Sequence, residues 1–466
     1  MKRHLATAFV CLASVSALAL SALAQEERPA GAAPTIAPAG SASGAAAPLA
    51  PTVPNNPDYT ALQEGKPVDT RLNENVRDKP LYPQQTRAPY HKTAPYQLTE
   101  ITSGLHAPWA LAFLPDGKFL VTEKLPGALR VIDTAGSIAP PVSGIEGLAR
   151  GWPQTGLFDL VLDPKFATNH RIFFTFFGFD RGMISGIQVA RATFNQAANS
   201  LSDVKVIFKA RPQTPNDNRS GVGSRSGGRM VMGKDGYLYI TIGDRDSGGS
   251  YPWLVAQTLD THLGKILRIT QDGKPAPGNP FTGPKDKQEG ALPEIWAIGG
   301  RSQEGLTFDN DGNLWETEHG PRGGDELNLI KKGANYGWPV VTHGIDYPGN
   351  QTGDSEVARA GTEQPVYYWS PSMGPSQVAF YKGNLFPEWK NSVFVAMLRG
   401  NALERLTLAN GKVVNEEPLL TEVKMRLRDV RVGPDGAVYV LSDSGGGSIT
   451  NNTPIGSKLL KLTPQP

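Results

Sequence analysis

The stretch that decides the fold is "GGRMVMGKDGYLYITIGD", residues 227–244. Apolar side chains alternate along it on both sides of an Asp-Gly pair at 235–236, and the second run is rich in aromatic residues. Alternation of this kind is typical of a β-strand, and Asp-Gly between two alternating runs favours a hairpin turn. The stretch is therefore predicted to form a β-hairpin.

The same pattern occurs six times in the chain. Similar stretches lie at 109–123, 157–176, 304–318, 377–398 and 428–444, with further strand-like runs such as "LGKILRIT" between them. Repeats of this length with about four strands each are typical of a β-propeller, whereas a two-sheet sandwich would not explain their regularity. The sequence thus predicts an all-β, six-bladed β-propeller over residues 96–466. Its functional site is expected at one mouth of the central channel, where loops of several blades meet.

The first 24 residues have the organisation of a secretory signal peptide. Lys2 and Arg3 supply a basic start, apolar or small residues follow, and Ala22-Leu23-Ala24 offers a cleavage site. A retained membrane anchor is the alternative, because about 20 apolar residues can span a bilayer. The signal indicates a periplasmic or secreted protein.

Two further segments precede the predicted propeller. Residues 25–57 consist mostly of Ala, Pro, Gly and Ser, which cannot bury enough apolar surface to offset the entropy of ordering. This segment is predicted to be a disordered low-complexity spacer. Residues 58–95 are polar and contain proline, and they are predicted to form a loosely attached arm.

The composition excludes several function classes. Lys plus Arg number 46 and Asp plus Glu number 44, so the formal net charge is only +2. A chain so close to neutrality has no strong field for nucleic acid or an anionic membrane. Its one cysteine, Cys11, lies within the predicted signal peptide. The mature chain would have no thiol, which excludes disulfides, thiolate metal sites and cysteine nucleophiles.

The segment "EHGPRGGDELNLIKKGANYGWP", residues 318–339, combines adjacent carboxylates, Asp325 and Glu326, with a Gly-Pro pair and a glycine-rich backbone. A phosphate-binding P-loop is excluded, because its sequence pattern and its following helix are both missing. Carboxylate and carbonyl oxygens are the ligands that Ca²⁺ prefers. The segment is therefore either a calcium site or a polar loop whose carboxylates cap its own backbone.

Four arginines at junctions between predicted strands and loops form a second pattern. Arg426 and Arg428 lie on one face of an extended strand, and Arg301 and Arg399 lie at other junctions. Guanidinium groups bind carboxylates through two parallel hydrogen bonds. The four residues are either the binding site of one polyanionic small molecule or four separate surface residues.

Longer motifs resemble a known family. "GLFDLVLDPKF" (156–166), "HLGKILRIT" (262–270), "HGPRGGDELNLIKKGANYGWP" (319–339) and "MRLRDVRVGPDGAVYVLSDS" (425–444) resemble the soluble PQQ-dependent sugar dehydrogenases, the glucose/sorbosone or aldose sugar dehydrogenase family. The resemblance extends from about residue 98 to the C-terminus. It implies a six-bladed propeller that holds pyrroloquinoline quinone (PQQ) over a Ca²⁺ ion at the channel mouth. It also implies oxidation of sugars at the anomeric carbon to lactones.

The resemblance further implies roles for individual residues, carried over by position. The carbonyls of Gly320 and Pro321 would bind the cofactor's Ca²⁺, and a second, structural Ca²⁺ would be bound by Glu326, the backbone of Tyr336 and Asp346. The implied cofactor-binding residues are Gln154, Arg301, Ser302, Arg399, Arg426 and Arg428, and Trp369 is implied as a wall of the sugar pocket. The cofactor carries three carboxylates that need cationic partners, and its quinone needs a Lewis acid to polarise the carbonyl that accepts hydride.

The chain departs from the family pattern at two positions. The family's general base is a histidine that opens an H-x-x-G-R motif, and Arg225 occupies that position in "RSGGR". An arginine cannot accept the sugar hydroxyl proton at neutral pH, so Asp159 and Glu304 are the candidate replacement bases. Arg225 would alternatively bind an acidic substrate such as a sugar acid. In the fourth blade the family's R-N-P-Q-G reads "RSQEG", so that Ser302 replaces an asparagine that contacts the cofactor.

These observations favour PQQ- and Ca²⁺-dependent oxidation of aldoses or related polyols. A Ca²⁺-dependent lactone hydrolase, which needs no quinone, is one alternative. A non-catalytic propeller that binds sugar or protein is another, and Arg225 favours it. Fold alone does not separate these functions. The expected partners are a small sugar substrate and an electron acceptor, either a cytochrome or a quinone, and the expected state is a monomer or homodimer.

Overall fold

A computed structural model describes residues 54, 56–148, 156–179, 184–215, 225–245, 254–282, 290–347, 349–352, 356–444 and 456–466. The predicted signal peptide (1–24) and nearly all of the predicted spacer (25–57) lie outside these ranges. Helical structure in the described part is limited to short segments: α1 (Phe166–Asn169), η2 (Val255–Gln257), η3 (Pro280–Thr282), η4 (Pro387–Trp389) and η5 (Thr421–Val423). No helix among the described residues has the length and apolar character needed to cross a membrane.

Six antiparallel sheets make up the rest of the fold, and each corresponds to one blade. From the innermost strand outward, blade 1 holds β2 (Pro108–Phe113), β3 (Phe119–Glu123) and β4 (Ala128–Ile132). Blade 2 holds β5 (Leu157–Leu162), β6 (Arg171–Phe179), β7 (Ile184–Asn195) and β8 (Ser200–Lys209), with β9 (Thr214–Pro215) paired to β7. Blade 3 holds β10 (Gly227–Met232), β11 (Leu238–Ile242), β12 (Lys265–Ile269) and β13 (Ile295–Ile298). Blade 4 holds β14 (Ser302–Phe308), β15 (Leu314–His319), β16 (Asp325–Ile330) and β17 (Tyr367–Trp369); blade 5 holds β18 (Pro375–Phe380), β19 (Ser392–Met397), β20 (Leu403–Ala409) and β21 (Lys412–Leu419); blade 6 holds β22 (Arg426–Val432), β23 (Val438–Asp443), β24 (Ser457–Pro464) and β1 (Tyr96–Leu105). The predicted all-β, six-bladed propeller is confirmed.

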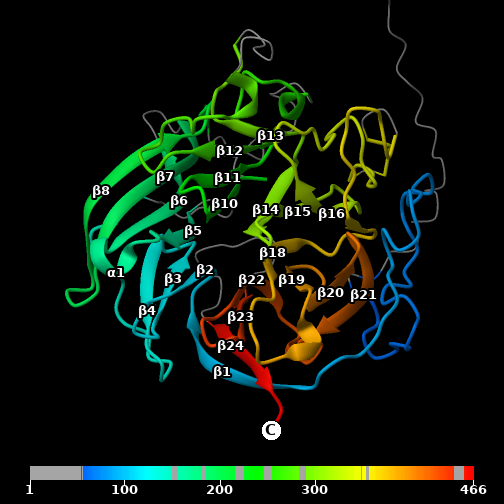
Figure 1. The fold of residues 1–466 in the computed structure, drawn as a ribbon, viewed down its shortest axis with the longest axis horizontal. Helices are drawn as coiled ribbons and strands as arrows, with labels where there is room; N and C mark the ends of the chain where they lie inside the picture. Colours follow the sequence, from blue (N-terminus) through cyan, green and yellow to red (C-terminus); the bar gives the residue numbers. More distant parts are fainter. Residues whose placement is uncertain are drawn as a thin grey trace, which may run out of the picture. The chain divides into compact units, whose positions relative to one another are not determined.

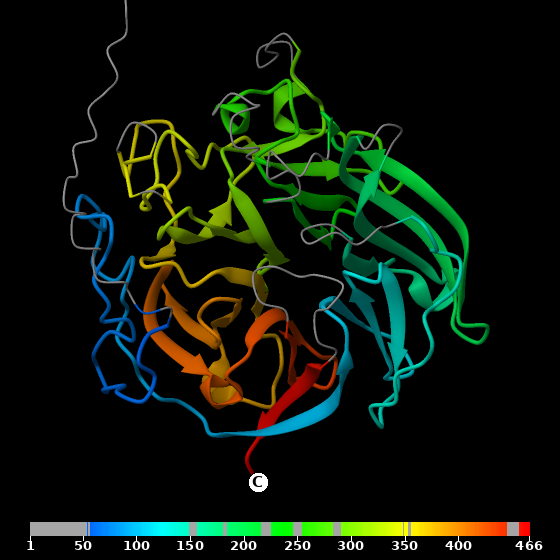
Figure 2. The same cartoon turned by 180° about the vertical axis from the view of Figure 1, so that it is seen from behind.

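The innermost strands form a closed ring. Neighbouring contacts run from β2 to β5, β10, β14, β18 and β22, and from β22 back to β2. Figures 1 and 2 show the six sheets around the centre of this ring from opposite sides. The ring closes through blade 6, where β1 pairs with β24 so that Tyr96 lies opposite Pro464 and Leu98 opposite Leu462. The first and last strands of the propeller thus share one sheet.

In blades 3 and 6 a tyrosine of the second strand is bonded to the Asp-Gly turn that precedes it. In blade 3 the carboxylate of Asp235 accepts a hydrogen bond from the Tyr239 hydroxyl at 2.9 Å, and Gly236 has a φ of 80°. That backbone region is favourable for glycine and strained for other residues. In blade 6 the Tyr439 hydroxyl donates to Asp435 at 2.8 Å in the same way. Both tyrosines therefore pack between blades and also stabilise the turn that precedes their strand.

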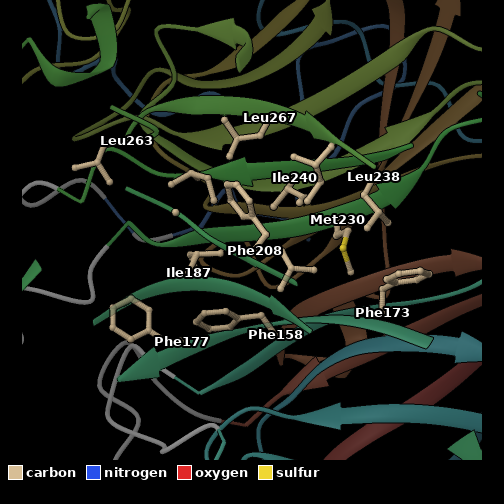
Figure 3. Packing of buried hydrophobic residues seen from close by; sticks show 14 of the residues in the cluster. Phe158, Phe173, Phe177, Ile187, Phe208, Met230, Leu238, Ile240, Leu263 and Leu267 are labelled. Carbon is tan, nitrogen blue, oxygen red and sulfur yellow. The ribbon is translucent and has the colours of Figure 1, made fainter. Parts of the chain in front are cut away.

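Apolar side chains pack between adjacent blades. Figure 3 shows Phe158 and Phe177 of blade 2 packed with Met230 and Ile240 of blade 3, and all four are buried. Complete burial of one such side chain contributes about 1.5–3 kcal/mol to stability. These contacts hold the inner strands of adjacent blades at fixed relative positions, and the channel mouth depends on those positions.

A buried arginine joins the innermost strands at the centre of the ring. Arg229 on β10 donates through Nη1 to Asp429 Oδ1 at 3.1 Å and through Nε to the Glu304 carbonyl at 2.7 Å. Its guanidinium lies 3.8 Å from the ring centroid of Trp109 on β2. Burial lowers the pKa of Arg229 to about 10, which still leaves it charged at neutral pH. Asp429 also accepts from Arg431 at 3.0 Å, so the innermost strands share one buried network of charges.

The segment before β1 follows the outer edges of blades 4 and 5, where it is drawn in dark blue (Figure 1). The backbone of Tyr368 donates to the Gln85 carbonyl at 2.9 Å, and that of Glu416 donates to the Pro89 carbonyl at 3.1 Å. The Tyr59 hydroxyl also donates to the carbonyl of Gly400 at 2.9 Å. These bonds cover edge-strand groups that would otherwise be open to pairing with another chain.

Candidate functional site

Strand register brings the candidate residues to one mouth of the channel. In each innermost hairpin, the start of the first strand pairs with the end of the second. Ser302 lies opposite His319 in blade 4, and Arg426 lies opposite Asp443 in blade 6. Residues that precede an innermost strand or follow its partner strand are therefore neighbours at the same end of the ring.

Arg301 precedes β14 at this mouth and is almost fully buried. Its Nη1 donates to the carbonyls of His319 at 2.8 Å and Gly320 at 2.7 Å, and its guanidinium lies 5.1 Å from the ring centroid of Trp338. Its Nε has no hydrogen-bond partner in the described part of the chain. Burial, and then the nearby Arg225, lowers the pKa of Arg301 below its ordinary value.

Arg426 and Arg428 also lie at the mouth, as predicted for one face of an extended strand. Arg428 contacts two carboxylates, Asp443 at 3.0 Å and Glu304 at 3.5 Å. Arg426 lies 3.9 Å from the same Asp443 oxygen, and its Nε has no hydrogen-bond partner among the described residues. The hydroxyl of Ser302 donates to Glu304 at 3.4 Å. Four predicted residues are thus brought together with Asp443.

Arg225, at the position of the family's base, is paired with a carboxylate. Its Nη1 donates to Asp244 Oδ2 at 3.0 Å, and the Trp338 indole donates to the same oxygen at 2.7 Å. Arg225 has a φ of 50°, a backbone region that non-glycine residues rarely adopt. The side chain therefore has a defined place at the mouth beside Trp338 and Arg301.

Asp159, one candidate base, belongs to the central network. It is fully buried on β5, and its Oδ2 accepts the Met230 backbone N–H at 2.9 Å. Its Oδ1 accepts from Arg431 at 3.0 Å and from the Leu160 backbone at 2.9 Å. Both oxygens already accept hydrogen bonds within the protein. Glu304, whose carboxylate is at the mouth, is the better placed of the two candidates.

Two other predicted residues have different surroundings. Trp369 on β17 is only 3% exposed, and its indole donates to Glu416 at 2.8 Å within the core between blades 4 and 5. The structure thus places it in packing rather than on an open wall. Arg399 follows β19 and is partly exposed, with its backbone N–H bonded to the Met373 carbonyl at 3.0 Å. Gln154 lies outside the described residues.

The loop at 318–339 combines both interpretations made from its sequence. Asp325 is fully buried and caps backbone, since it accepts hydrogen bonds from the N–H groups of Gly320, Met373 and Gly374 at 2.7–2.9 Å. Its partner in the predicted pair, Glu326, is also buried but makes no such caps. The polar-loop interpretation therefore describes Asp325, and the cation interpretation depends on Glu326 and the loop carbonyls.

Glu326 belongs to a cluster of buried carboxylates on β15 and β16, which also contains Glu316 and Glu318. Asn328 donates to Glu316 at 3.2 Å and to Glu326 at 3.0 Å, while Glu316 Oε1 and Asn328 Oδ1 have no partner among the described residues. Burial raises the pKa of all three glutamates above the ordinary range. The cluster thus contains more oxygen acceptors than donors, which is the environment that a hard cation would stabilise.

The other predicted ligands of this second cation, Asp346 and the Tyr336 backbone, have hydrogen-bond partners elsewhere, the Tyr336 N–H donating to the Ile298 carbonyl at 2.9 Å. Asp346 is in an exposed turn, where it accepts from the backbones of Gly349 at 2.8 Å and Asn350 at 2.6 Å. The Tyr336 hydroxyl donates to the Leu329 carbonyl at 2.7 Å. In the described ranges, no three His, Cys, Asp or Glu side chains are arranged closely enough to hold a metal ion as they stand.

The mouth also contains residues that the sequence patterns did not single out. Lys124 follows β3 directly, Asp244 follows β11, and Asp443 ends β23. All three therefore occupy the end of the second strand of their hairpin. Aligning the four hairpin copies that contain an Asp-Gly pair would have found these positions, because equivalent positions of each copy face the same mouth.

Comparisons with known proteins are consistent with this geometry. Residues 105–451 match the family model described as Glucose / Sorbosone dehydrogenase. The aldose sugar dehydrogenase YliI of Escherichia coli (strain K12) is 36% identical over 354 residues, which cover 75% of this chain and 91% of that protein.

Two solved structures extend the comparison. The soluble aldose sugar dehydrogenase of Escherichia coli in its apo-form superposes with a TM-score of 0.70 at 34% identity, covering 80% of this chain and 100% of that one. The PQQ-bound aldose sugar dehydrogenase of Streptomyces coelicolor superposes with a TM-score of 0.61 at 26% identity, again covering 80% and 100%. Both similarities extend over the propeller rather than over one motif.

Proposed function

Because the chain belongs to the glucose/sorbosone dehydrogenase family, a family of sugar oxidoreductases, we propose that it oxidises an aldose or related polyol to a lactone with PQQ and Ca²⁺. The observation that carries this proposal is the cationic mouth. Among the described residues, five cationic side chains gather at the mouth, Lys124, Arg225, Arg301, Arg426 and Arg428, and the carboxylates of Asp244, Glu304 and Asp443 lie among them.

The residues present fit a polyanionic cofactor. The Nε groups of Arg301 and Arg426 are buried donors without acceptors among the described residues. A buried unsatisfied donor costs about 1–3 kcal/mol, so a carboxylate that accepts from it is stabilised accordingly. When bound, PQQ supplies the hydride acceptor and Ca²⁺ the Lewis acid. Arg301, Arg426 and Arg428 would bind and orient the cofactor's carboxylates.

Proton transfer from the sugar hydroxyl needs a residue of this chain. Arg225 remains a cation at neutral pH and cannot accept a proton. Glu304 carries a carboxylate at the mouth whose partners among the described residues are Arg428 and Ser302, so we assign it the role of proton acceptor. Substituting it with glutamine is expected to lower the rate by about 10²–10⁴ while cofactor affinity changes little.

Calcium has two candidate places. One uses the Gly320 and Pro321 carbonyls, and the Gly320 carbonyl would become free only when Arg301 Nη1 withdraws from it. The other is the Glu316, Glu318 and Glu326 cluster, where the ion would neutralise carboxylates that now repel one another. Oxygen-rich sites with several carboxylates are those that Ca²⁺ occupies most readily.

A non-catalytic binding function is the second candidate, and the cation at the position of the family's base favours it. Arg225 and its partner Asp244 would then bind a sugar or sugar acid without oxidising it. On the basis of the predicted signal peptide we propose a periplasmic location for either function, and for the oxidation a cytochrome or a quinone as the electron acceptor.

Absorbance titration of the full-length protein with PQQ, with and without Ca²⁺, tests the proposal. Saturable binding is expected, and Arg426→Ala and Arg428→Ala are each expected to weaken it about ten- to a hundredfold. Arg191→Ala is a matched control, because Arg191 pairs with Asp272 on the surface of another blade. Reduction of a redox dye by the PQQ- and Ca²⁺-loaded protein in the presence of aldoses would support the proposed sugar oxidation. Absence of saturable PQQ binding would refute the proposal, and tight binding without oxidation of any sugar would favour the binding function.

A further inference from the structure

Lys124 is held rigidly at the mouth by its backbone and its packing. Its N–H donates to the Ala107 carbonyl at 2.9 Å, and its carbonyl accepts from Leu157 at 3.2 Å. A Cβ atom on Gly156 would lie 1.9 Å from the Lys124 carbonyl oxygen and 3.1 Å from its Cγ, so only glycine fits beside it. The residue is 7% exposed. The lysine therefore cannot move freely out into solvent, and its ammonium group stays among the charged groups of the mouth.

The ammonium group makes no hydrogen bond or ion pair with any residue that the structure describes. The charged groups that face it are Arg428, Asp443, Glu304 and Arg426, from blades 4 and 6. Both carboxylates in this set already contact Arg428, at 3.0 and 3.5 Å. A buried cation without an acceptor is unfavourable unless a ligand supplies one.

We propose that Lys124 is an anion-binding residue of the mouth, which binds a carboxylate of the cofactor beside Arg426 and Arg428. The proposal rests on the proposed function. The expected ligand of Lys124 is the cofactor, because PQQ carries carboxylates whereas a neutral aldose or polyol has no anionic group. The proposal adds a cation from blade 1 to those from blades 4 and 6, so the bound molecule would be held from several sides of the channel.

Binding should then be coupled to a proton. Burial, and then the nearby Arg428, lowers the pKa of Lys124 to about 8. A carboxylate beside the ammonium group favours its charged form and raises that pKa. Above about pH 8 the free protein has lost part of this proton, and cofactor binding must take it up again. Cofactor affinity is therefore expected to fall as pH rises above 8, with a proton taken up on binding.

The test compares PQQ dissociation constants of full-length variants by absorbance titration at pH 7 and pH 9. Lys124→Met is expected to weaken binding about ten- to a hundredfold at pH 7 and to lose most of the pH dependence. Lys124→Arg keeps a charge that does not titrate in this range, so it should bind within about threefold of wild type at pH 7 and keep that affinity at pH 9, where wild type binds more weakly. Lys118→Met is the matched control on the same hairpin, since Lys118 pairs with Asp116 on the surface.

The outcomes separate this proposal from the one on which it rests. Wild-type protein that fails to bind PQQ refutes both. Wild-type protein that binds PQQ while Lys124→Met binds equally well refutes only the role of Lys124. A Lys124→Met variant that keeps cofactor affinity and raises only the KM for sugar would also refute it, and would assign the lysine to the substrate instead. A Lys124→Arg variant that binds as poorly as Lys124→Met would show that shape rather than charge is required.

Discussion

The guanidinium of Arg301 donates to the carbonyl oxygen of Gly320 at 2.7 Å. In the proposed site these two residues would bind ligands of opposite charge, because a guanidinium binds anions and a carbonyl oxygen binds cations. A guanidinium and a Ca²⁺ ion at one oxygen repel each other and compete for the same lone pairs. In the free protein, Arg301 therefore disfavours a cation at Gly320, and an anion that attracts Arg301 would relieve this competition.

Arg301→Ala is expected to bind Ca²⁺ more tightly than wild type in the absence of PQQ. The variant no longer loses a charge-assisted hydrogen bond of about 1.5–3 kcal/mol when the ion binds, which corresponds to roughly tenfold or more in affinity. Calorimetric titration with Ca²⁺ measures this. Arg322→Ala is the control, because Arg322 lies in the same loop but binds Glu74 instead. Weaker Ca²⁺ binding by Arg301→Ala would contradict competition at Gly320.

Glu326→Gln is expected to change stability in opposite directions with and without Ca²⁺. Without the ion, the substitution removes one of three buried carboxylates that repel one another, so the melting temperature should rise. With the ion at about 100 times its Kd, wild type gains about 2.7 kcal/mol, and the variant should gain far less. Thermal melts with EDTA or Ca²⁺ measure both effects. Asp346→Asn is the control, and its melting temperature should respond to Ca²⁺ as that of wild type does. Equal gains in stability from Ca²⁺ in wild type, Glu326→Gln and Asp346→Asn would show that Glu326 is not a ligand.

Arg225→His is expected to raise aldose oxidation at neutral pH, by about tenfold or more, because it restores a proton acceptor at the position of the family's base. The Asp244 carboxylate now bonded to Arg225 would orient the imidazole. Arg225→Lys keeps the positive charge and should show no increase. Initial rates from pH 6 to pH 9 on aldoses and sugar acids measure this. A wild-type preference for sugar acids that Arg225→His abolishes would instead assign Arg225 to an acidic substrate.

Glu404→Gln is expected to stabilise the fold, and more so as pH rises. Glu404 on β20 is fully buried, and neither carboxylate oxygen has a partner among the described residues. Burial, and then Glu416, raises its pKa well above 4.5. The folded protein keeps a proton that the unfolded chain releases, so the free energy of unfolding falls as pH rises from about 4.5 towards the folded pKa, by up to about 1.4 kcal/mol per unit.

Urea unfolding at pH 5 and pH 8 measures this effect. The advantage of Glu404→Gln over wild type should be larger at pH 8. Glu417→Gln is the matched control, since Glu417 binds Arg405 at 2.7 Å and its loss leaves that guanidinium unpaired. It should destabilise the fold at both pH values, by about 3–5 kcal/mol. An advantage of Glu404→Gln that does not change with pH would refute the titration.

The sequence predicts local structure well because each hairpin carries its own signals. Alternating side chains and an Asp-Gly pair such as Asp235-Gly236 define two strands and a turn without help from the rest of the chain. Arg426 and Arg428, two positions apart on one strand, then both approach Asp443 at the mouth, although the pairing register shifts at Arg428. The number of blades follows from counting the copies.

Long-range relationships escape the same reasoning. Tyr96 pairs with Pro464, and no local sequence pattern around either residue predicts this pairing. Asp159 and Glu304 look alike in sequence, yet one is enclosed by the central network and the other lies at the mouth. Trp369 packs into the core because Glu416, on another blade, accepts from its indole. Such outcomes depend on which blades become neighbours, and side-chain periodicity does not encode that.

The pairing of β1 with β24 makes the mouth dependent on the end of the chain. Lys124 belongs to blade 1 and Arg428 to blade 6, and these blades become neighbours only when the sheet shared by β1 and β24 is complete. During synthesis, five blades could form their hairpins while the mouth still lacked one side. If the mouth binds the proposed cofactor, a ligand that contacts both residues would link the first and last blades, and deletion of β24 should abolish binding before it abolishes the remaining sheets.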